Sequence, residues 1–291
     1  MNTEIRDSEE KNALERGTLY LVGTPIGNLS DMSPRALKVL AECDFIAAED
    51  TRVSGKLTNY FGIKKPFVSY YEQNSKERGP QIIERLKDGE ICALVTDAGM
   101  PAISDPGQDL VRLCHENGIK VSCAPGPTAF ATALAMSGMP NRKFAFYGFI
   151  SNDKSERDKT ILELSELPCT VILYEAPHHL KKTLSDILSK TGDRKIALCR
   201  ELTKINEEIL HTTLSESVKM YEDTLPKGEF VIIMEGRNEN EDKDFWTDMS
   251  VNEHVLYYIN LGYERNAAMK AAAKDRNVSK SEIYEKIMKK D

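Results

Sequence analysis

The chain has 291 residues, of which 41% are hydrophobic and 29% charged, and its 39 basic and 46 acidic side chains give a formal net charge of −7. This composition is that of a globular protein and excludes a disordered or fibrous chain. The acidic balance also excludes a protein that coats nucleic acid through a generally basic surface, although it leaves room for a local basic site.

Short β-rich runs alternate with helical patterns up to residue 236. The runs that predict strands are 18–22, 45–48, 91–96, 120–123, 144–149, 171–174, 195–199 and 230–234, and helical periodicity occupies 34–41, 81–86, 110–115, 129–136 and 180–188. This alternation predicts α/β units with largely parallel sheets. The pairs Ser33-Pro34 and Asp105-Pro106 predict helix starts, with Ser33 or Asp105 as the N-cap and the proline in the first helical position.

The length predicts two domains, with room for a small third. We expect a polar N-terminal tail (1–16), an N-terminal α/β domain (17–125) and a C-terminal α/β domain (126–236), because Ala-Pro-Gly-Pro at 124–127 breaks regular structure. Residues 235–253 hold seven acidic and two basic side chains, which predicts an acidic linker (237–250). The last segment (251–291) reads as a helix-turn-helix-like tail, in which Ser279 and Glu282 form a capping pair.

The six cysteines form no CxxC pair, and most lie in apolar segments; they are Cys43, Cys92, Cys114, Cys123, Cys169 and Cys199. We therefore expect buried free thiols rather than a zinc site. The sequence shows neither the apolar core of a signal peptide nor the roughly 18 apolar residues of a membrane span. These features predict a cytoplasmic protein.

Three loops beside predicted strands are candidates for ligand binding. They are 23–28 (Gly-Thr-Pro-Ile-Gly-Asn), the glycine- and proline-rich stretch 97–107, and 125–129, which opens a helix of small residues. Open α/β sheets bind ligands at the carboxyl ends of their strands, and helix N-termini offer unpaired N–H groups. None of the three is a dinucleotide fingerprint or a P-loop. Taken singly, the first is better explained as a tight turn, and the third is equally well explained as a hinge.

Charged side chains also end predicted strands, at 49–52, 174–179, 200–204 and 227–229. Such groups can hold a catalytic base or orient a phosphate. For Glu49 to Arg52 an N-cap with a local ion pair is the simpler explanation. The neighbouring His178 and His179 point in different directions and the HExxH motif is absent, so we expect no metal there.

In this order, the motifs resemble those of the ribosomal RNA small subunit methyltransferase I family, a branch of the tetrapyrrole-methylase superfamily. The resemblance runs from Gly17 through the stretches 23–29, 47–52, 97–107, 125–127, 174–175, 200–204 and 227–230, and the tail resembles the helix-turn-helix appendage of many members. It implies two α/β domains of the tetrapyrrole-methylase type. It also implies an S-adenosylmethionine-dependent enzyme, acting as a homodimer, that methylates the ribose 2′-hydroxyl of a cytidine in 16S rRNA of the small ribosomal subunit.

Carried over by position, the resemblance implies cofactor contacts from Pro25, Gly99, Met100, Ile103, Ser104, Thr128, Ala129, Tyr174, Gly228 and Glu229. For the chemistry, we hypothesise that Asp50 or Glu175 serves as base or orienter, and that Arg52, Arg200 and Lys204 hold phosphates and stabilise the oxygen. Methyl transfer is an in-line displacement that depends strongly on alignment and needs no metal.

The chain departs from the family pattern where a histidine-rich stretch often follows the third strand, because it has Tyr70, Tyr71, Glu72, Gln73 and Asn74 there. This argues against a histidine base at that point.

Two alternatives stay open. The first is a methylase of a tetrapyrrole or other small molecule on the same fold, and the charged motifs at 49–52 and 200–204 and the helical tail speak against it. The second is a non-catalytic RNA-binding or assembly factor, and the intact loops at 97–107 and 125–129 speak against that.

Overall fold

The computed structural model describes residues 13–237, 246 and 249–288. The chain separates into two units, residues 1–235 and 236–291. Most of the predicted N-terminal tail and most of the predicted acidic linker lie outside the described residues.

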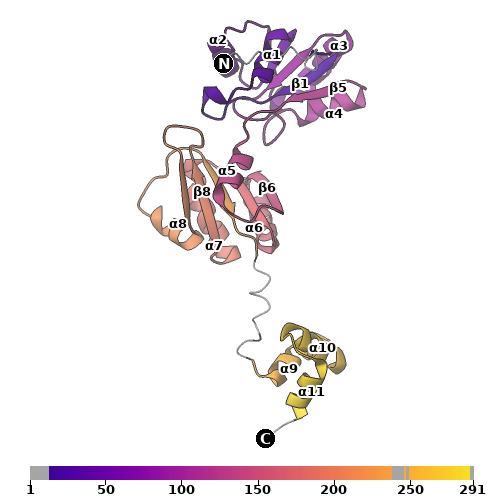
Figure 1. The fold of residues 1–291 in the computed structure, drawn as a ribbon, viewed down its shortest axis with the longest axis vertical. Coiled ribbons are helices and arrows are strands. Elements are labelled where there is room, and N and C mark those ends of the chain that lie inside the picture. Colours follow the sequence, from indigo (N-terminus) through magenta and orange to yellow (C-terminus); the bar gives the residue numbers. More distant parts are fainter. Residues whose placement is uncertain (1–12, 238–245, 247–248, 289–291) are drawn as a thin grey trace, which may run out of the picture. The chain divides into compact units, whose positions relative to one another are not determined.

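The first sheet of the larger unit is entirely parallel and has the order β3-β2-β4-β1-β5. Its strands are β1 (Thr18–Val22), β2 (Phe45–Ala48), β3 (Phe67–Ser69), β4 (Cys92–Val95) and β5 (Lys120–Ala124), and its helices are α1 (Pro34–Glu42), α2 (Thr51–Tyr60), α3 (Ser75–Lys87) and α4 (Gln108–Glu116) (Figure 1). Two short 3-10 turns, η1 (Leu29–Asp31) and η2 (Glu72–Asn74), complete it. Every residue of β2 and β4 is buried, as expected of a parallel sheet covered on both faces.

The second sheet has the order β6-β7-β10-β8-β9 and is mostly antiparallel. Its strands are β6 (Phe144–Phe149), β7 (Thr170–Glu175), β8 (Lys195–Arg200), β9 (Glu208–Thr213) and β10 (Phe230–Met234). Only the pair β6–β7 is parallel. The prediction of largely parallel sheets is therefore wrong for this half, because β10 enters between β7 and β8 and the unpredicted β9 returns as a hairpin from β8.

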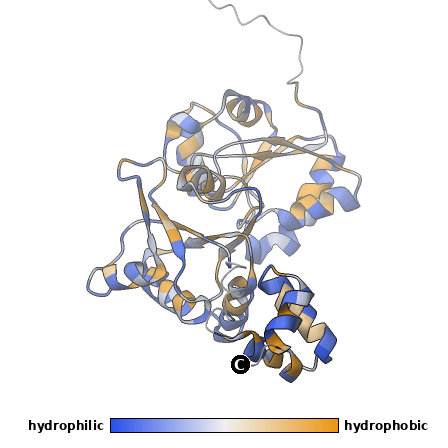
Figure 2. Ribbon diagram, turned by 60° about the horizontal axis from the view of Figure 1, so that its bottom comes forward, coloured by the Kyte–Doolittle hydropathy of each residue, from blue (hydrophilic) through white to orange (hydrophobic). Residues whose placement is uncertain are grey.

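Helices cover both faces of this second sheet. Alternate residues of β7 show the division, since Val171 and Leu173 pack with α6 (Lys154–Glu166), α7 (Pro177–Thr191) and α8 (Leu214–Met220), whereas Ile172 packs with α5 (Ala129–Ser137) on the other face. The period-2 pattern of a strand explains the two separate apolar clusters. In Figure 2 the apolar residues accordingly follow the strands and one side of the helices.

The helix starts test two of the capping predictions. Ser33 caps α1 as predicted, and its hydroxyl accepts a hydrogen bond from the amide of Ala36. The prediction that Asp105 caps α4 is wrong, because that helix begins at Gln108 with Gly107 as its N-cap. Asp105 instead belongs to a loop in which Ala102 and Ser104 adopt positive φ values of 67° and 60°.

The smaller unit contains α9 (Val251–Asn260), α10 (Arg265–Asp275) and α11 (Lys280–Met288) around an apolar cluster of its own. The small side chains of Ala268 and Ala272 are fully buried there, which permits close helix packing. Ser279 and Glu282 form the reciprocal hydrogen bonds of the predicted cap. The helical tail is thus confirmed.

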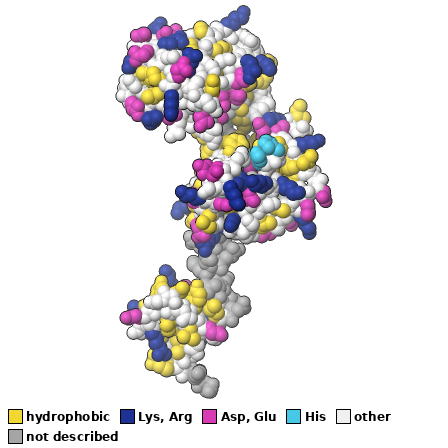
Figure 3. Space-filling view, turned by 180° about the vertical axis from the view of Figure 1, so that it is seen from behind, with side chains coloured by type: hydrophobic (Ala, Val, Ile, Leu, Met, Phe, Trp, Pro, Cys, Tyr) yellow, Lys and Arg dark blue, Asp and Glu magenta, His cyan; other side chains and the backbone are white. Residues whose placement is uncertain are grey.

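The surface of the molecule mixes basic and acidic side chains, as Figure 3 shows for one face. All six cysteines are free; four are buried, and Cys123 and Cys169 are partly exposed. Among the described residues, no helix is both long and apolar enough to cross a membrane.

Candidate functional site

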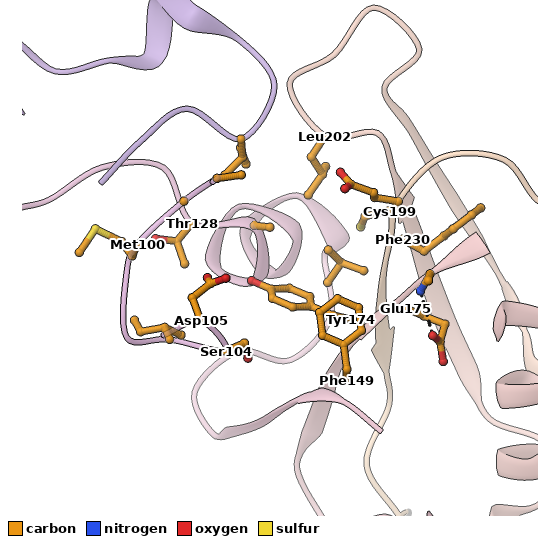
Figure 4. Close-up of a pocket in the computed structure, with 18 of the residues that line it drawn as sticks. Met100, Ser104, Asp105, Thr128, Phe149, Tyr174, Glu175, Cys199, Leu202 and Phe230 are labelled. Carbon is orange, nitrogen blue, oxygen red and sulfur yellow. Dashed lines mark hydrogen bonds between the residues drawn. The ribbon is translucent and has the colours of Figure 1, made fainter. Parts of the chain in front are cut away.

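A cavity of about 370 Å³ in the larger unit is lined by loops from both sheets. Its wall takes residues from the loops that follow β4 and β8, from the N-terminus of α5, and from the strands β7 and β10. Apolar side chains, among them Ile26, Phe149 and Leu202, alternate with a few polar ones, as in most small-molecule sites. Figure 4 shows these side chains converging on one space.

The three loops singled out in the sequence meet at this cavity. Backbone hydrogen bonds join Thr24 to Gly99 in both directions, at 2.9 and 3.1 Å. A Cβ added to Gly23 would lie 2.6 Å from the backbone of Gly126, and one added to Gly126 would lie 2.8 Å from the Cα of Gly23. The two loops can approach so closely only because both residues are glycine.

Tyr174 connects the second sheet to the helix that opens at the cavity. Its hydroxyl accepts a hydrogen bond of 3.1 Å from the amide of Phe130, in the first turn of α5. The rings of Phe146 and Phe149 pack edge-on against it, with centroids 5.0 and 5.5 Å away. These contacts fix the aromatic wall of the cavity.

Eight of the ten predicted cofactor residues line the cavity: Gly99, Met100, Ile103, Ser104, Thr128, Ala129, Tyr174 and Glu229. Pro25 and Gly228 do not line it. Gly228 has a φ of +87°, and a Cβ there would lie 2.5 Å from the side chain of Glu201. The predicted residues therefore make up eight of the nineteen that line the cavity. Whether they hold the cofactor stays a prediction.

The predicted pair Asp50 and Arg52 lies outside the cavity wall. Asp50 caps α2, and its carboxylate accepts hydrogen bonds from the Arg52 amide at 2.8 Å and from the Arg52 guanidinium at 2.6 and 3.0 Å. These bonds lower the pKa of Asp50 to about 2. This is the N-cap with a local ion pair that the sequence offered as the simpler explanation.

Glu175 lines the cavity, but its carboxylate is engaged on the side of α7 (Figure 4). It accepts a hydrogen bond from the Thr183 hydroxyl and another, of 2.8 Å, from the amide of Ala176. Thr183 in turn accepts from Arg157, which forms a 2.7 Å ion pair with Asp186. The carboxylate is thus one member of a buried polar chain.

The predicted cations Arg200 and Lys204 are both paired with acidic side chains. Arg200 lies 3.1 Å from Glu208, and Lys204 lies 2.9 Å from Glu201 and 2.8 Å from Glu229. Since Glu229 lines the cavity, Lys204 is connected to the cavity wall through that carboxylate.

Sequence analysis missed one cavity residue with an acid–base property of its own, Asp105. Burial raises the pKa of its carboxyl to about 6, the charges of Glu49 and Asp97 act in the same direction, and hydrogen bonding by Thr96 opposes them. In Figure 4 the carboxylate points into the cavity beside Tyr174. The Asp-Pro pair resembled a helix start so closely that it concealed this residue, although the three acceptor side chains within 97–107, those of Asp97, Ser104 and Asp105, exceed what a turn needs.

Comparisons with known proteins identify what this chain is similar to. The family model for tetrapyrrole (corrin/porphyrin) methylases matches residues 18–217. A protein from Halalkalibacterium halodurans named ribosomal RNA small subunit methyltransferase I is 46% identical over 272 residues, which cover 93% of this chain and 94% of that protein. A protein of the same name from Thermotoga maritima is 44% identical over 221 residues, covering 76% of this chain and 99% of that one.

Among solved structures, the uroporphyrin-III-C-methyltransferase from Thermus thermophilus matches with a TM-score of 0.53 and 21% identity, covering 75% of this chain and 94% of that chain. This likeness shows the fold alone.

Proposed function

The chain belongs to the ribosomal RNA small subunit methyltransferase I family, and from this membership we propose that it transfers a methyl group from S-adenosylmethionine to the ribose 2′-hydroxyl of a cytidine in 16S rRNA of the small ribosomal subunit. The observation that carries the proposal is the 46% identity over nearly the whole length of a relative with that name. The fold by itself would not choose between acceptors, since superfolds host many functions.

The cavity lined by Gly99, Thr128 and Tyr174 has the size and the lining of a site for a molecule such as S-adenosylmethionine. Its volume lies within the roughly 300–1,000 Å³ usual for small-molecule sites, and its wall combines apolar side chains with a few polar ones. Gly99 has a φ of +88°, which favours glycine at this turn of the wall. We assign the cofactor contacts to the eight predicted residues on the wall, and to Pro25 and Gly228 the shaping of the adjoining loops.

S-adenosylmethionine supplies a methyl group bound to a positively charged sulfur. When an oxygen nucleophile takes the methyl group, the sulfur leaves as a neutral thioether. A ribose hydroxyl becomes a competent nucleophile only as its proton is removed. We assign this base role to Asp105, because its carboxylate faces the cavity and its pKa of about 6 lies closer to neutrality than that of an ordinary aspartate.

The remaining charged residues then have supporting roles. Glu175 positions Tyr174 by anchoring the end of β7 to α7 through Thr183. Arg52, whose side chain is 86% exposed, offers a cation for an RNA phosphate while Asp50 orients its guanidinium. Arg200 and Lys204 offer cations for RNA phosphates at the second sheet. Each would exchange its carboxylate partner for a phosphate oxygen when the RNA binds.

The rRNA substrate supports a cytoplasmic location. The resemblance to the family supports a homodimer. Eight basic side chains from Gly262 onward support contact between the tail and RNA, and Figure 3 shows further basic side chains gathered near the histidines of the larger unit.

A tetrapyrrole acceptor is the alternative, because the family model that matches is that of the tetrapyrrole (corrin/porphyrin) methylases. The test is incubation of the protein with radiolabelled S-adenosylmethionine and either 30S subunits from cells that lack this gene or a precorrin. We expect label in the RNA, recovered as 2′-O-methylcytidine after nuclease digestion. Label in the precorrin alone would contradict the proposal.

A further inference from the structure

A second cavity, of about 490 Å³, adjoins the first and shares Ser104 and Asp105 with it. Its other walls come from Glu49 at the end of β2, from the segment after β3, and from the N-terminus of α4. The side chain assigned as the base therefore stands in the partition between two spaces. A group held in the second cavity can present an atom to Asp105.

The lining of this second cavity is rich in hydrogen-bond acceptors. Four carboxylates contribute to it, those of Glu49, Glu72, Asp105 and Asp109, and no lysine or arginine is among its lining residues. Such a wall repels phosphate and favours a ligand that presents N–H donors.

Most of these carboxylates already have partners. Glu49 accepts a 2.9 Å hydrogen bond from the Thr96 hydroxyl, and Asp109 forms a 3.1 Å ion pair with Arg112. The exposed carboxylate of Glu72 makes no ion pair or side-chain hydrogen bond with the residues that the structure describes. It is the acceptor most available to a ligand.

Two tyrosines make the second cavity more than an acidic surface. Tyr70 lines it and is 1% exposed; the Leu110 amide lies beside its buried hydroxyl, and the hydroxyl finds no acceptor for its own proton within the described part of the chain. A buried donor without an acceptor is costly, so its presence points to a ligand or water that accepts this proton. Tyr71, 39% exposed, presents an aromatic ring at the same cavity.

We propose that the second cavity binds the base of the acceptor cytidine, with Glu72 accepting a hydrogen bond from its exocyclic amine and Tyr70 donating to one of its ring acceptors. The inference rests on the proposed function. Cytosine carries an N4 amine where uracil carries an oxygen, so a carboxylate distinguishes the two bases. Tyr71 supplies the stacking surface that an unstacked base requires.

This placement also orders the rest of the nucleotide. With the cytosine in the second cavity, the ribose lies at the partition formed by Ser104 and Asp105, beside the cofactor cavity. The phosphates stay outside, because carboxylates would repel them. Glu72 and Tyr70 are therefore specificity-determining residues, and neither is the general base, which is Asp105.

The test compares methyl transfer to two substrates: unmodified 30S subunits, and subunits whose rRNA carries uridine at the position found to be methylated. Wild-type protein, Glu72→Gln, Tyr70→Phe and the control Glu77→Gln are assayed with both. Glu77 is an exposed residue in the first turn of α3 that lines neither cavity. Calorimetric titration with S-adenosylmethionine reports whether each variant is folded and binds cofactor as wild type does.

We expect wild type and Glu77→Gln to prefer the cytidine substrate. Glu72→Gln should reduce that preference on the order of tenfold. Tyr70→Phe should raise KM for the subunit more than it lowers kcat. Full activity and unchanged preference in both cavity variants would overturn the assignment and leave the proposed function standing. Absence of transfer by wild-type protein to either substrate would contradict the proposed function, and the cavity assignment with it.

Discussion

At the scale of the residue, the role of each carboxylate depends on what it contacts. Asp50 and Glu175 are engaged by Arg52 and Thr183, whereas Asp105 faces the cavity. The local sequence already offered the N-cap and ion pair of Asp50, because Arg52 lies two residues away. For Glu175 and Asp105 it could not, because Thr183 and the cavity wall come from other segments of the chain.

Replacing Asp105 by asparagine tests its assignment as the base. We expect kcat to fall by about 10² or more, measured as labelled methyl incorporation at saturating S-adenosylmethionine. Since a base acts when deprotonated, the wild-type rate should rise with pH through about 6 and then level off. The exposed Asp88, replaced in the same way, is the matched control. A variant with the wild-type rate and pH profile would refute the assignment.

The same substitution should stabilise the protein. The folded state raises the pKa of Asp105 from 3.8 to about 6, so the folded state binds more protons than the unfolded chain in that window. Stability must therefore decline as pH rises from about 4 to 6, and the charge is a net cost at neutral pH. Thermal unfolding at pH 7.5 should show a higher Tm for Asp105→Asn than for wild type, and a lower one would argue against the buried charge.

At the scale of the element, much of the fold could be predicted from local pattern. The strands at 18–22, 45–48, 144–149 and 230–234 have their predicted bounds, because each is a largely apolar run that begins directly after a polar or turn residue. The helix α3 begins at Ser75 rather than 81, since Gly79 and Pro80 read as breakers but lie within it. The antiparallel direction of β10 was missed, because it depends on β7 and β8, which are distant in sequence. The edge strand β9 was missed although its partner β8 is close in sequence, because its residues are only partly buried and mix polar with apolar side chains.

Among the loops, the contact between Gly23 and Gly126 is the most sensitive to substitution. In Gly126→Ala the new methyl would meet the backbone of Gly23 within 2.9 Å, and neither backbone can move without disturbing the cavity. We expect a loss of about 1–3 kcal/mol in unfolding free energy, measured by denaturant titration, together with weaker S-adenosylmethionine binding.

Gly55→Ala provides the control for that change. Gly55 lies within α2, and nothing surrounds its Cβ position within 4 Å, so the substitution should be neutral or stabilising by roughly 0.5–1 kcal/mol. Equal effects of the two substitutions on the unfolding free energy would contradict a specific role for the close contact between Gly23 and Gly126.

At the scale of the whole molecule, both cavities are formed by residues before 235, and the helical unit has a separate core. The Thermotoga maritima relative is matched almost completely by 76% of this chain. Its length is therefore close to that of the α/β part alone. This agrees with a division in which the α/β part holds both cavities and the helical unit is separate.

The helical unit should lose stability in acid. His254 is fully buried, and burial together with the charge of Arg276 lowers its pKa below 6.5, against the opposing effect of Asp275. The unfolded chain therefore binds a proton near pH 6.5 that the folded unit does not, so stability falls as pH drops through that value.

The single tryptophan, Trp246, stacks on His254 and reports this unit by fluorescence. The midpoint of urea unfolding followed by this fluorescence should be lower at pH 5.5 than at pH 7.5, and His254→Gln should abolish this difference. A midpoint independent of pH would contradict the lowered pKa of His254.

The most direct test of the central claim is the state of the rRNA in cells. Ribose methylation of 16S rRNA should be mapped in a strain with this gene, in one without it, and in the latter complemented with wild type or with Asp105→Asn. We predict one cytidine whose 2′-O-methyl group disappears with the gene, returns with wild type and does not return with the variant. An unchanged methylation pattern in the deletion strain would contradict the account.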